Sequence, residues 1–516
     1  MAAVSYKSHF PEKSDSKTIA ALQAMVKQCA KELAGIQKQF HYDTIRLSTP
    51  DRTLLAEILV DFAFDLHCNS GLWSALERCN IKLFGTSLPL IQPQGIDLPS
   101  GVCQERVHFL LWNFYSLIDP DDSWFSPQHV DILIAAEKIT DWLVRQLPSF
   151  PKTSPIKKFL DNSNDYGWQA KRKLVWLGTQ SYIFRILFDQ YFEERFEGRH
   201  QIAVIDDFLC QQTTPWSGLG AIDLLAECLD VPEEQKTELR NWYLRHASFY
   251  KIAKADNEIT EAINLVNDVS YRIREGTPVK LSPRLFKPGM TAYGSLVPWR
   301  GEWYWSGEQF IVPPCTPDQI AQMVAKHKQN TQIVARFWPE REKAVRERME
   351  EEFQSKMKHY GNDLVVLPNG RTWEREETKR IAADMAKRGF MGKMPRFSIS
   401  EHLLNCKTGI GISLDPVEGM EIMEHFNAIR SGLKKNGNNC TPDEENILRI
   451  WVDATAISPA FIFRALKEYG GEESIKRAIR WETDAPYWLD YLLRCRKGEY
   501  YRKRFPALSF VEREND

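Results

Sequence analysis

Acidic side chains on two predicted helices are the first residues of this chain that could do chemistry. Glu57, Asp61 and Asp65 stand four residues apart, so they line one face of the first predicted helix. Glu105 and His108 form a Glu-x-x-His pair on adjacent turns of the second. Ferritin-like bundles hold two metal ions with such groups, but they need two Glu-x-x-His pairs, and the sequence offers one. These metal candidates also fit a solvated acidic face and a partly buried histidine.

Common catalytic and nucleotide-binding motifs are missing from the sequence. It has no Cys-x-x-Cys, Gly-x-Ser-x-Gly or His-Glu-x-x-His motif, so the sequence gives no support for a zinc finger, an acyl-transfer enzyme or a zincin protease. The run from Thr408 to Ser413, TGIGIS, lacks the third glycine and the Lys-Ser or Lys-Thr of a phosphate-binding loop. Glycines in such a run more often mark close backbone approach in a strand. The sequence therefore indicates no cofactor and identifies no catalytic residue.

The C-terminus combines positive charge with flat side chains. Arginine and lysine neutralise phosphates and aromatic rings stack on exposed bases, so the mixture suits single-stranded nucleic acid. A solvated helix end that packs its rings inward would carry the same residues. A second basic segment lies just before a predicted helix. The candidate nucleic-acid-binding residues are Arg494, Arg496, Lys497, Tyr500, Tyr501, Arg502, Lys503 and Arg504 at the C-terminus, and Lys171, Arg172 and Lys173 in the second segment.

Three tryptophans lie close together in sequence, in and just before one predicted strand. Trp303 and Trp305 alternate with Tyr304, so the two indoles face one side of the strand and the phenol faces the other. If that side is the core, the indoles fill a barrel. If it is the rim, Trp299, Trp303 and Trp305 form a surface that docks a partner chain.

Three parts of different pattern must position these residues. Residues 1–247 repeat apolar positions at steps of three and four, which predicts a helical N-terminal domain. Short alternating runs broken by Gly, Pro and Asn turns predict a small central β-barrel over 248–313. Residues 314–516 combine strand-like runs with helical periodicity, which predicts a mixed, mostly helical C-terminal domain. The predicted fold class is α+β, and most of it is helical.

One segment of the helical part has no predicted secondary structure. Residues 84–101, FGTSLPLIQPQGIDLPSG, are rich in proline and glycine. Loops of this length usually have a role in compact domains. The sequence leaves open whether it is a lid, a contact surface or a long connection.

The composition is that of an ordinary soluble protein. Of the 516 residues, 43% are hydrophobic and 26% are charged, and the formal net charge is −2, so nucleic-acid binding would need a local patch. The N-terminus lacks the apolar core of a secretory signal, and no apolar run is long enough to cross a membrane. Ten unpaired, scattered cysteines are typical of reduced thiols. We therefore expect a cytoplasmic protein without a membrane partner.

The barrel segment resembles a β-rich module of uncharacterised bacterial proteins, some of which carry the SEC-C cysteine-rich metal motif. The cysteine motif itself is absent here, so the resemblance implies a layout of the fold and no metal function. No activity is established for the family, so no catalytic residue carries over. The residues that carry the resemblance are Phe249-Tyr250, Asn264–Asp268, Pro288-Gly289 and Ser306-Gly307 in the barrel segment, and Ile410–Gly419 and Ile457–Phe461 further along the chain.

A non-enzymatic cytoplasmic binding or regulatory protein is the leading functional prediction. Its predicted partner is RNA, a ribonucleoprotein or another protein, and the C-terminal basic cluster would contact phosphates. One alternative is an enzyme, metal-dependent or not, with a site between domains and with the acidic candidates as its first residues. Another alternative is a protein–protein interaction subunit that docks through the tryptophans.

Overall fold

The computed structural model describes most of the 516-residue chain, and the chain divides into two compact units. The first unit comprises Met1–His327 and Thr483–Glu499, and the second comprises Lys328–Glu482 and Tyr500–Asp516. In the described residues, no helix is both long and apolar enough to cross a membrane. The described ranges are 6–11, 14–42, 45–118, 125–196, 201–256, 258–274, 286–329, 338–389 and 400–502.

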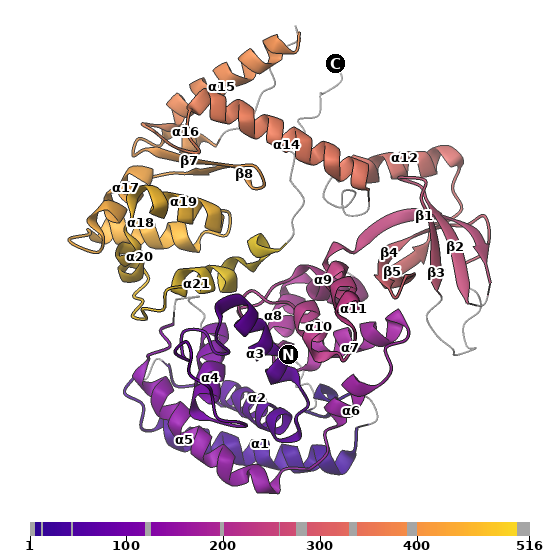
Figure 1. Ribbon diagram of the computed structural model, residues 1–516, viewed down its shortest axis with the longest axis vertical. Coiled ribbons are helices and arrows are strands. Elements are labelled where there is room, and N and C mark those ends of the chain that lie inside the picture. The colour runs from indigo at the N-terminus through magenta and orange to yellow at the C-terminus, as the bar shows by residue number, and fades with distance from the viewer. Residues whose placement is uncertain are drawn as a thin grey trace. The chain divides into compact units, whose positions relative to one another are not determined.

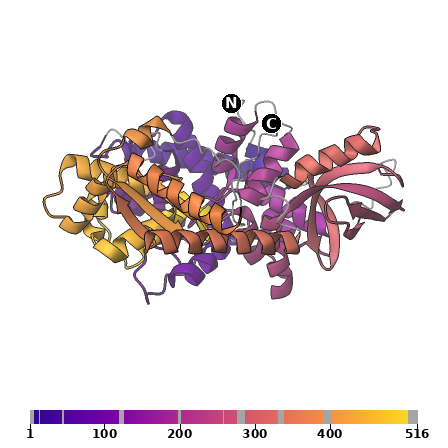
Figure 2. The same ribbon diagram turned by 90° about the horizontal axis from the view of Figure 1, so that it is seen from above.

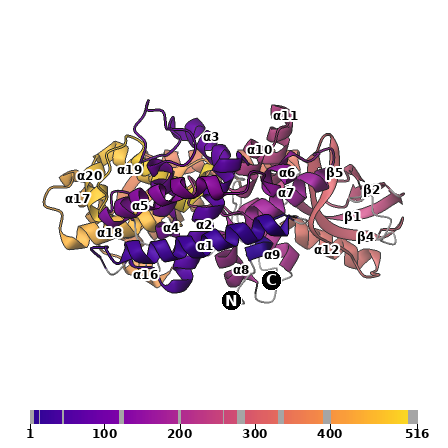
Figure 3. The same cartoon turned by 90° about the horizontal axis from the view of Figure 1, so that it is seen from below.

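Helices make up the first part of the first unit, as the apolar periodicity predicts (Figure 1). Asp15 caps the first long helix, and Ser48 caps the second, which has a proline in its first turn. Figure 3 shows α1 beside α2 and α5. The helices before the barrel are η1 (Tyr6–His9), α1 (Ser16–Gln37), α2 (Thr49–Cys68), α3 (Leu72–Phe84), α4 (Gln104–Ile118), α5 (Val130–Gln146), η3 (Leu147–Ser149), α6 (Pro155–Asp161), α7 (Gly167–Gln180), α8 (Arg185–Arg195), α9 (Gln201–Gln211), α10 (Ala221–Cys228), α11 (Glu233–Arg240) and η4 (Asn241–Leu244). From the C-terminal end of the chain, α21 (Trp488–Lys497) also belongs to the first unit, and η5 (Gly498–Tyr501) begins in it.

The predicted central β-barrel is confirmed, and its strands curve around a common interior (Figures 1 and 2). The strand order is β1-β2-β3-β5-β4, closed by pairing of β4 with β1. Strands β3 and β5 pair in parallel, and the other neighbours in the barrel pair antiparallel. This order and these directions match those of the OB-fold, a five-stranded Greek-key barrel. The strands are β1 (His246–Ala255), β2 (Ile259–Asn264), β3 (Ser270–Arg274), β4 (Thr291–Trp299) and β5 (Glu302–Ile311).

Alternate residues of the strands fill the barrel. Tyr250 and Ile273 are fully buried in its core, and Trp303 and Trp305 pack against that core from β5. Tyr304 lies on the opposite side of β5 and packs on Gly167 of α7, where an added Cβ would be 2.7 Å from the tyrosine ring. Packing of the indoles inside the barrel is therefore the alternative that the structure supports.

A buried carboxylate joins the barrel to the helices of the same unit. Asp206 on α9 accepts hydrogen bonds from Lys171 and Arg245, and its Oδ1 lies 3.1 Å from the Ser306 hydroxyl of β5. Gly307 follows on β5 with φ of +73°, and a Cβ there would lie 2.3 Å from Oδ2 of Asp206. The close approach of strand and carboxylate therefore requires glycine at this position.

The second unit pairs a small antiparallel sheet, in the order β6-β7-β8, with helices. A Cβ on Gly411 of β7 would lie 2.2 Å from the ring of Phe426, so that glycine permits close packing of a helix. Helix α12 (Pro317–Gln329) links the barrel to this part of the chain. The remaining elements are α14 (Pro339–Tyr360), β6 (Leu364–Leu367), α15 (Gly370–Lys387), α16 (Glu401–Asn405), β7 (Ile410–Asp415), β8 (Gly419–Met423), α17 (Phe426–Lys435), α18 (Pro442–Asp453), α19 (Pro459–Tyr469) and α20 (Glu472–Ala478).

Candidate functional site

A cavity of about 680 Å³ lies beside α8 in the first unit, and we call it the α8 cavity. One face of α8 forms its wall, because the lining residues recur at steps of three and four along that helix. The side chains of η1, the end of α7 and the start of α9 complete the lining. The residues from α8 are Arg185, Phe188, Asp189, Phe192 and Glu193, followed by Phe196 just past the helix end.

A buried ion pair lies at the inner end of this wall. Nη1 of Arg185 donates to Oδ2 of Asp61 at 2.6 Å, and the hydroxyl of Tyr6 donates to Oδ1 of the same carboxylate at 2.5 Å. Asp61 and Arg185 are both almost completely buried. The carboxylate therefore neutralises the guanidinium inside the protein and holds it in one orientation.

Polar atoms beside this ion pair have no hydrogen-bond partner within the described part of the chain. They are Nε and Nη2 of Arg185 and Nδ1 of His9, although only 3% of Arg185 and 9% of His9 is exposed. The nearest carboxylate is that of Glu57, whose Oε2 lies 3.8 Å from Nη2 and 3.9 Å from Nδ1. These distances exceed hydrogen-bonding range, and unpartnered buried polar atoms are rare in proteins.

Three ionisable groups around the α8 cavity have strongly shifted pKa values. Burial raises the pKa of Glu57 to about 7, although Arg185 lowers it. Burial likewise raises the pKa of Asp189 to about 6, against the effect of Arg185. Burial and the charge of Arg185 lower the pKa of His9 to about 3, so this imidazole is neutral at physiological pH. Carboxyl groups that titrate near neutrality can take up or release a proton, and such groups cluster at functional sites.

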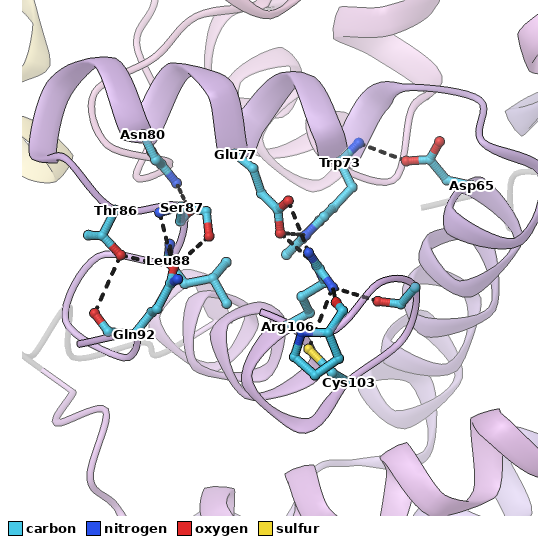
Figure 4. A network of polar contacts seen from close by, with 12 residues as sticks. Asp65, Trp73, Glu77, Asn80, Thr86, Ser87, Leu88, Gln92, Cys103 and Arg106 are labelled. Carbon is cyan, nitrogen blue, oxygen red and sulfur yellow. Dashed lines mark hydrogen bonds and ion pairs between the residues drawn. The ribbon is translucent and has the colours of Figure 1, made fainter. Parts of the chain in front are cut away.

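The acidic candidates from the sequence separate in the structure. Glu57 and Asp61 lie beside the α8 cavity, whereas Asp65 caps α3 by accepting from the backbone N–H of Trp73 at 2.7 Å (Figure 4). It also accepts from the Tyr182 hydroxyl at 2.8 Å.

The Glu-x-x-His pair of α4 has other surroundings. Glu105 is half-buried in the first turn of the helix, and Nε2 of His108 lies 2.6 Å from the carbonyl oxygen of Pro127. In the described ranges, no group of three or more His, Cys, Asp or Glu side chains is arranged to hold a metal ion. The structure therefore brings two of the five candidates to one site.

The second basic segment is largely engaged inside the fold. Lys171 pairs with the buried Asp206, and Lys173 is 2% exposed. The ammonium group of Lys173 donates to the carbonyl oxygens of Leu160 and Asn162, at 2.7 Å and 2.5 Å. Arg172 is the exposed member of the three.

The C-terminal basic cluster spans the two units, since the division falls after Glu499. Arg494 pairs with Asp490 at 2.9 Å and lies 5.8 Å from the ring centroid of Phe84. Lys497 is buried, and the Tyr500 hydroxyl donates to the carbonyl oxygen of Thr455 at 2.8 Å. Arg496, Tyr500, Tyr501 and Arg502 are half-buried, and Lys503 and Arg504 lie outside the described residues.

The remaining candidate for partner docking, Trp299, is fully buried. Its indole N–H donates to the carbonyl oxygen of Asn164 at 2.8 Å, and its ring meets that of Trp242 edge-on at 6.1 Å. These contacts join the barrel to the helices of the same unit.

Side-chain hydrogen bonds hold the proline-rich segment at residues 84–101 in place (Figure 4). Oε1 of Gln92 accepts from the hydroxyls of Thr86 and Ser87, at 2.9 Å and 2.5 Å. Arg106 of α4 pairs with Glu77 of α3 at 2.7 Å and also donates to the Gly101 carbonyl oxygen. The side-chain amide of Asn80 on α3 also donates to the carbonyl oxygen of Ser87 at 3.0 Å. The first part of the segment is therefore fixed against α3 and its end against α4.

The residues that α8 contributes to the cavity are not among the candidates from the sequence. The sequence does show that they share one helix face, because helical spacing relates Arg185, Phe188, Asp189 and Phe192. Nothing in the sequence indicates that His9 would face them.

Residues 54–202 match the model of a family described as a protein of unknown function (DUF3843). The comparisons with curated proteins and with solved structures found no match. The matched stretch holds every group of the α8 cavity discussed above except Tyr6 and His9, and it ends before the barrel. A family without an assigned activity is also what the resemblance indicated, although that resemblance concerned residues beyond the matched stretch. Over residues 54–202 the chain is thus similar to a family of unknown function, and the α8 cavity lies largely within that stretch.

Proposed function

We propose that the chain is a binding protein that takes a small molecule with an apolar body into the α8 cavity. Three buried polar atoms at the lining of this cavity carry the proposal: Nε and Nη2 of Arg185 and Nδ1 of His9, which have no hydrogen-bond partner in the described residues. Ligand sites combine a mostly apolar wall with a few polar groups that fix the orientation of the ligand. Phe188, Phe192 and Phe196 supply the apolar wall here.

A fragment screen by ligand-observed NMR tests this proposal. Gln180 lines the cavity from the end of α7, so Gln180→Trp should fill the space. We expect fragments with an aromatic or aliphatic body to bind the wild-type protein, and to lose at least about tenfold in affinity in the Gln180→Trp variant. Glu194→Trp is the matched control, since Glu194 is exposed on α8 and does not line the cavity. Fragments that bind both variants and the wild type equally would place their site elsewhere and contradict the proposal.

RNA is a second candidate ligand, as the basic clusters predict. The OB-type strand order of the barrel favours it, because barrels of this topology bind oligonucleotides on the face of strands two and three. The outward positions on that face here carry charged Glu261 and Arg272 but no aromatic ring in the described residues. Base stacking on the barrel therefore adds little support, and phosphate contacts would have to come from the C-terminal cluster.

Charge reversal at the C-terminus tests the RNA proposal. We expect the combined change Arg502→Glu, Lys503→Glu and Arg504→Glu to weaken binding of labelled single-stranded RNA, whatever its sequence. It should also reduce the slope of log affinity against log salt by about 0.7 for each phosphate that these side chains neutralise in the wild type. Filter binding at low and physiological salt measures both quantities. Unchanged affinity and slope would remove this cluster as an RNA-binding surface.

A further inference from the structure

We infer that the ligand of the α8 cavity carries a positively charged ammonium head group, which Asp189 holds against the rings of Phe188 and Phe192, and which the carboxylate of Glu57 beside the cavity also attracts. The inference rests on the proposed function, because it names the ligand class for the same cavity.

The charged groups around the α8 cavity favour a cationic ligand. Arg185 is the one cation among the cavity groups described, and Asp61 already neutralises it at 2.6 Å. In the described residues, Glu57 forms no hydrogen bond, and Asp189 has neither a hydrogen bond nor an ion pair. Glu193 adds a third carboxylate at the exposed end of the wall. Among the described groups at the cavity, negative charge is therefore in excess, which favours a cation over an anion.

The aromatic wall of the α8 cavity also favours an ammonium ligand. The ring centroids of Phe188 and Phe192 are 5.5 Å apart, and those of Phe192 and Phe196 are 4.6 Å apart. Asp189 follows Phe188 in sequence and lines the same cavity. Aromatic faces within about 6 Å attract ammonium groups, most strongly where water is excluded. Rings and a carboxylate on one helix face can thus contact the same ammonium group and its apolar body.

The pH dependence of binding reports the sign of the ligand charge. Burial raises the pKa of Glu57 to about 7 and that of Asp189 to about 6. A bound cation favours the ionised carboxylates, so it releases protons and binds more tightly as pH rises; an anion would bind more tightly as pH falls. Of the other groups near these carboxylates, Tyr6, with a pKa raised by burial, and His9, with a pKa of about 3, stay neutral in this range. Arg185 stays charged beside Asp61, and Glu193 adds a carboxylate near Asp189.

Three fluorescent probes of similar size distinguish the head groups: naphthylethylamine, naphthylethanol and naphthylacetate. We expect the amine to bind at least about tenfold more tightly than the other two at neutral pH. Its affinity should rise by roughly tenfold between about pH 5 and about pH 8, as Asp189 and Glu57 ionise. Asp189→Asn should remove most of its advantage. Glu194→Gln is the control, because Glu194 lies on the same helix without lining the cavity. Fluorescence titration gives all these affinities, and circular dichroism checks that the variants remain folded.

The outcomes separate the inference from the proposed function. If naphthylacetate binds most tightly, or if the affinity of the amine falls as pH rises, the ammonium inference is wrong while small-molecule binding stands, provided that Gln180→Trp abolishes it. If no probe binds in a way that Gln180→Trp blocks, both are wrong.

Discussion

Replacing Asp206 by asparagine should lower the free energy of unfolding of the first unit by about 3–5 kcal/mol at neutral pH. Asp206 is buried, and it is the shared partner of Lys171 and Arg245, which come from α7 and from the residue before the barrel. An amide in its place leaves two cations in the interior without a counter-charge. The same change removes the carboxylate that Ser306 of β5 meets, so it also weakens the junction between the helices and the barrel. Chemical denaturation followed by tryptophan fluorescence measures the effect.

The effect of Asp206 should depend on pH in a defined direction. Burial alone would raise the pKa of this carboxyl, but Lys171 and Arg245 outweigh it and hold the pKa at about 2, below the ordinary value of 3.8. A depressed folded-state pKa stabilises the protein above the unfolded pKa, and this stabilisation is lost as pH falls through the folded value. The difference between wild type and Asp206→Asn should therefore shrink by about 2 kcal/mol between about pH 5 and about pH 2.

The neighbouring residue provides a control for this prediction. Asp207 pairs with Arg245 at 2.9 Å but is partly exposed, so Asp207→Asn should cost only about 1 kcal/mol or less. If the two substitutions lower the free energy of unfolding equally, or if the effect of Asp206→Asn does not change with pH, then Asp206 does not stabilise the junction between the helices and the barrel.

Replacing Arg185 by methionine should also cost about 3–5 kcal/mol at neutral pH. The substitution leaves Asp61 buried, with the Tyr6 hydroxyl as its remaining partner. Burial raises the pKa of Asp61 even in the presence of Arg185, and removal of the guanidinium should raise it further. A raised folded-state pKa makes stability fall as pH rises, so the variant should regain stability as pH is lowered toward about 4.

Two other substitutions are controls for the stability loss expected of Arg185→Met. Arg185→Lys keeps a cation beside Asp61 and should lose less stability than the methionine variant. Arg195→Met changes an exposed arginine of the same helix and should have little effect. A methionine variant at Arg185 that is as stable as wild type at neutral pH would show that the ion pair with Asp61 is not formed in solution.

Local patterns predict the elements of this fold better than their assembly. The stripe of apolar residues in α1 and the turn residues around 248–313 specify a helix and a set of hairpins without any knowledge of neighbours. The alternation of Trp303, Tyr304 and Trp305 also sets which side chains share a face. The parallel pairing of β3 with β5 and the closing pair of β1 with β4 join strands that are separated along the chain, and no local pattern encodes either pairing.

The candidate sites show the same division. Lys171 looked like a phosphate contact, but tertiary packing places Asp206 beside it, and a residue 35 positions away leaves no local signal. Glu57 and Asp61 were correctly placed on one helix face, while their partners come from η1 and α8. Shifted pKa values likewise arise from burial, which depends on the folded chain. The chemistry of the α8 cavity therefore becomes visible only once the helices are assembled.

A crystal structure of the protein with naphthylethylamine would show directly whether the α8 cavity is the ligand site. We predict that the naphthyl group lies in the α8 cavity against Phe188 and Phe192, with its ammonium nitrogen within about 3 Å of an oxygen of Asp189. An amine that binds at another surface while the α8 cavity holds none would contradict the claim that this cavity is the ligand site of the protein.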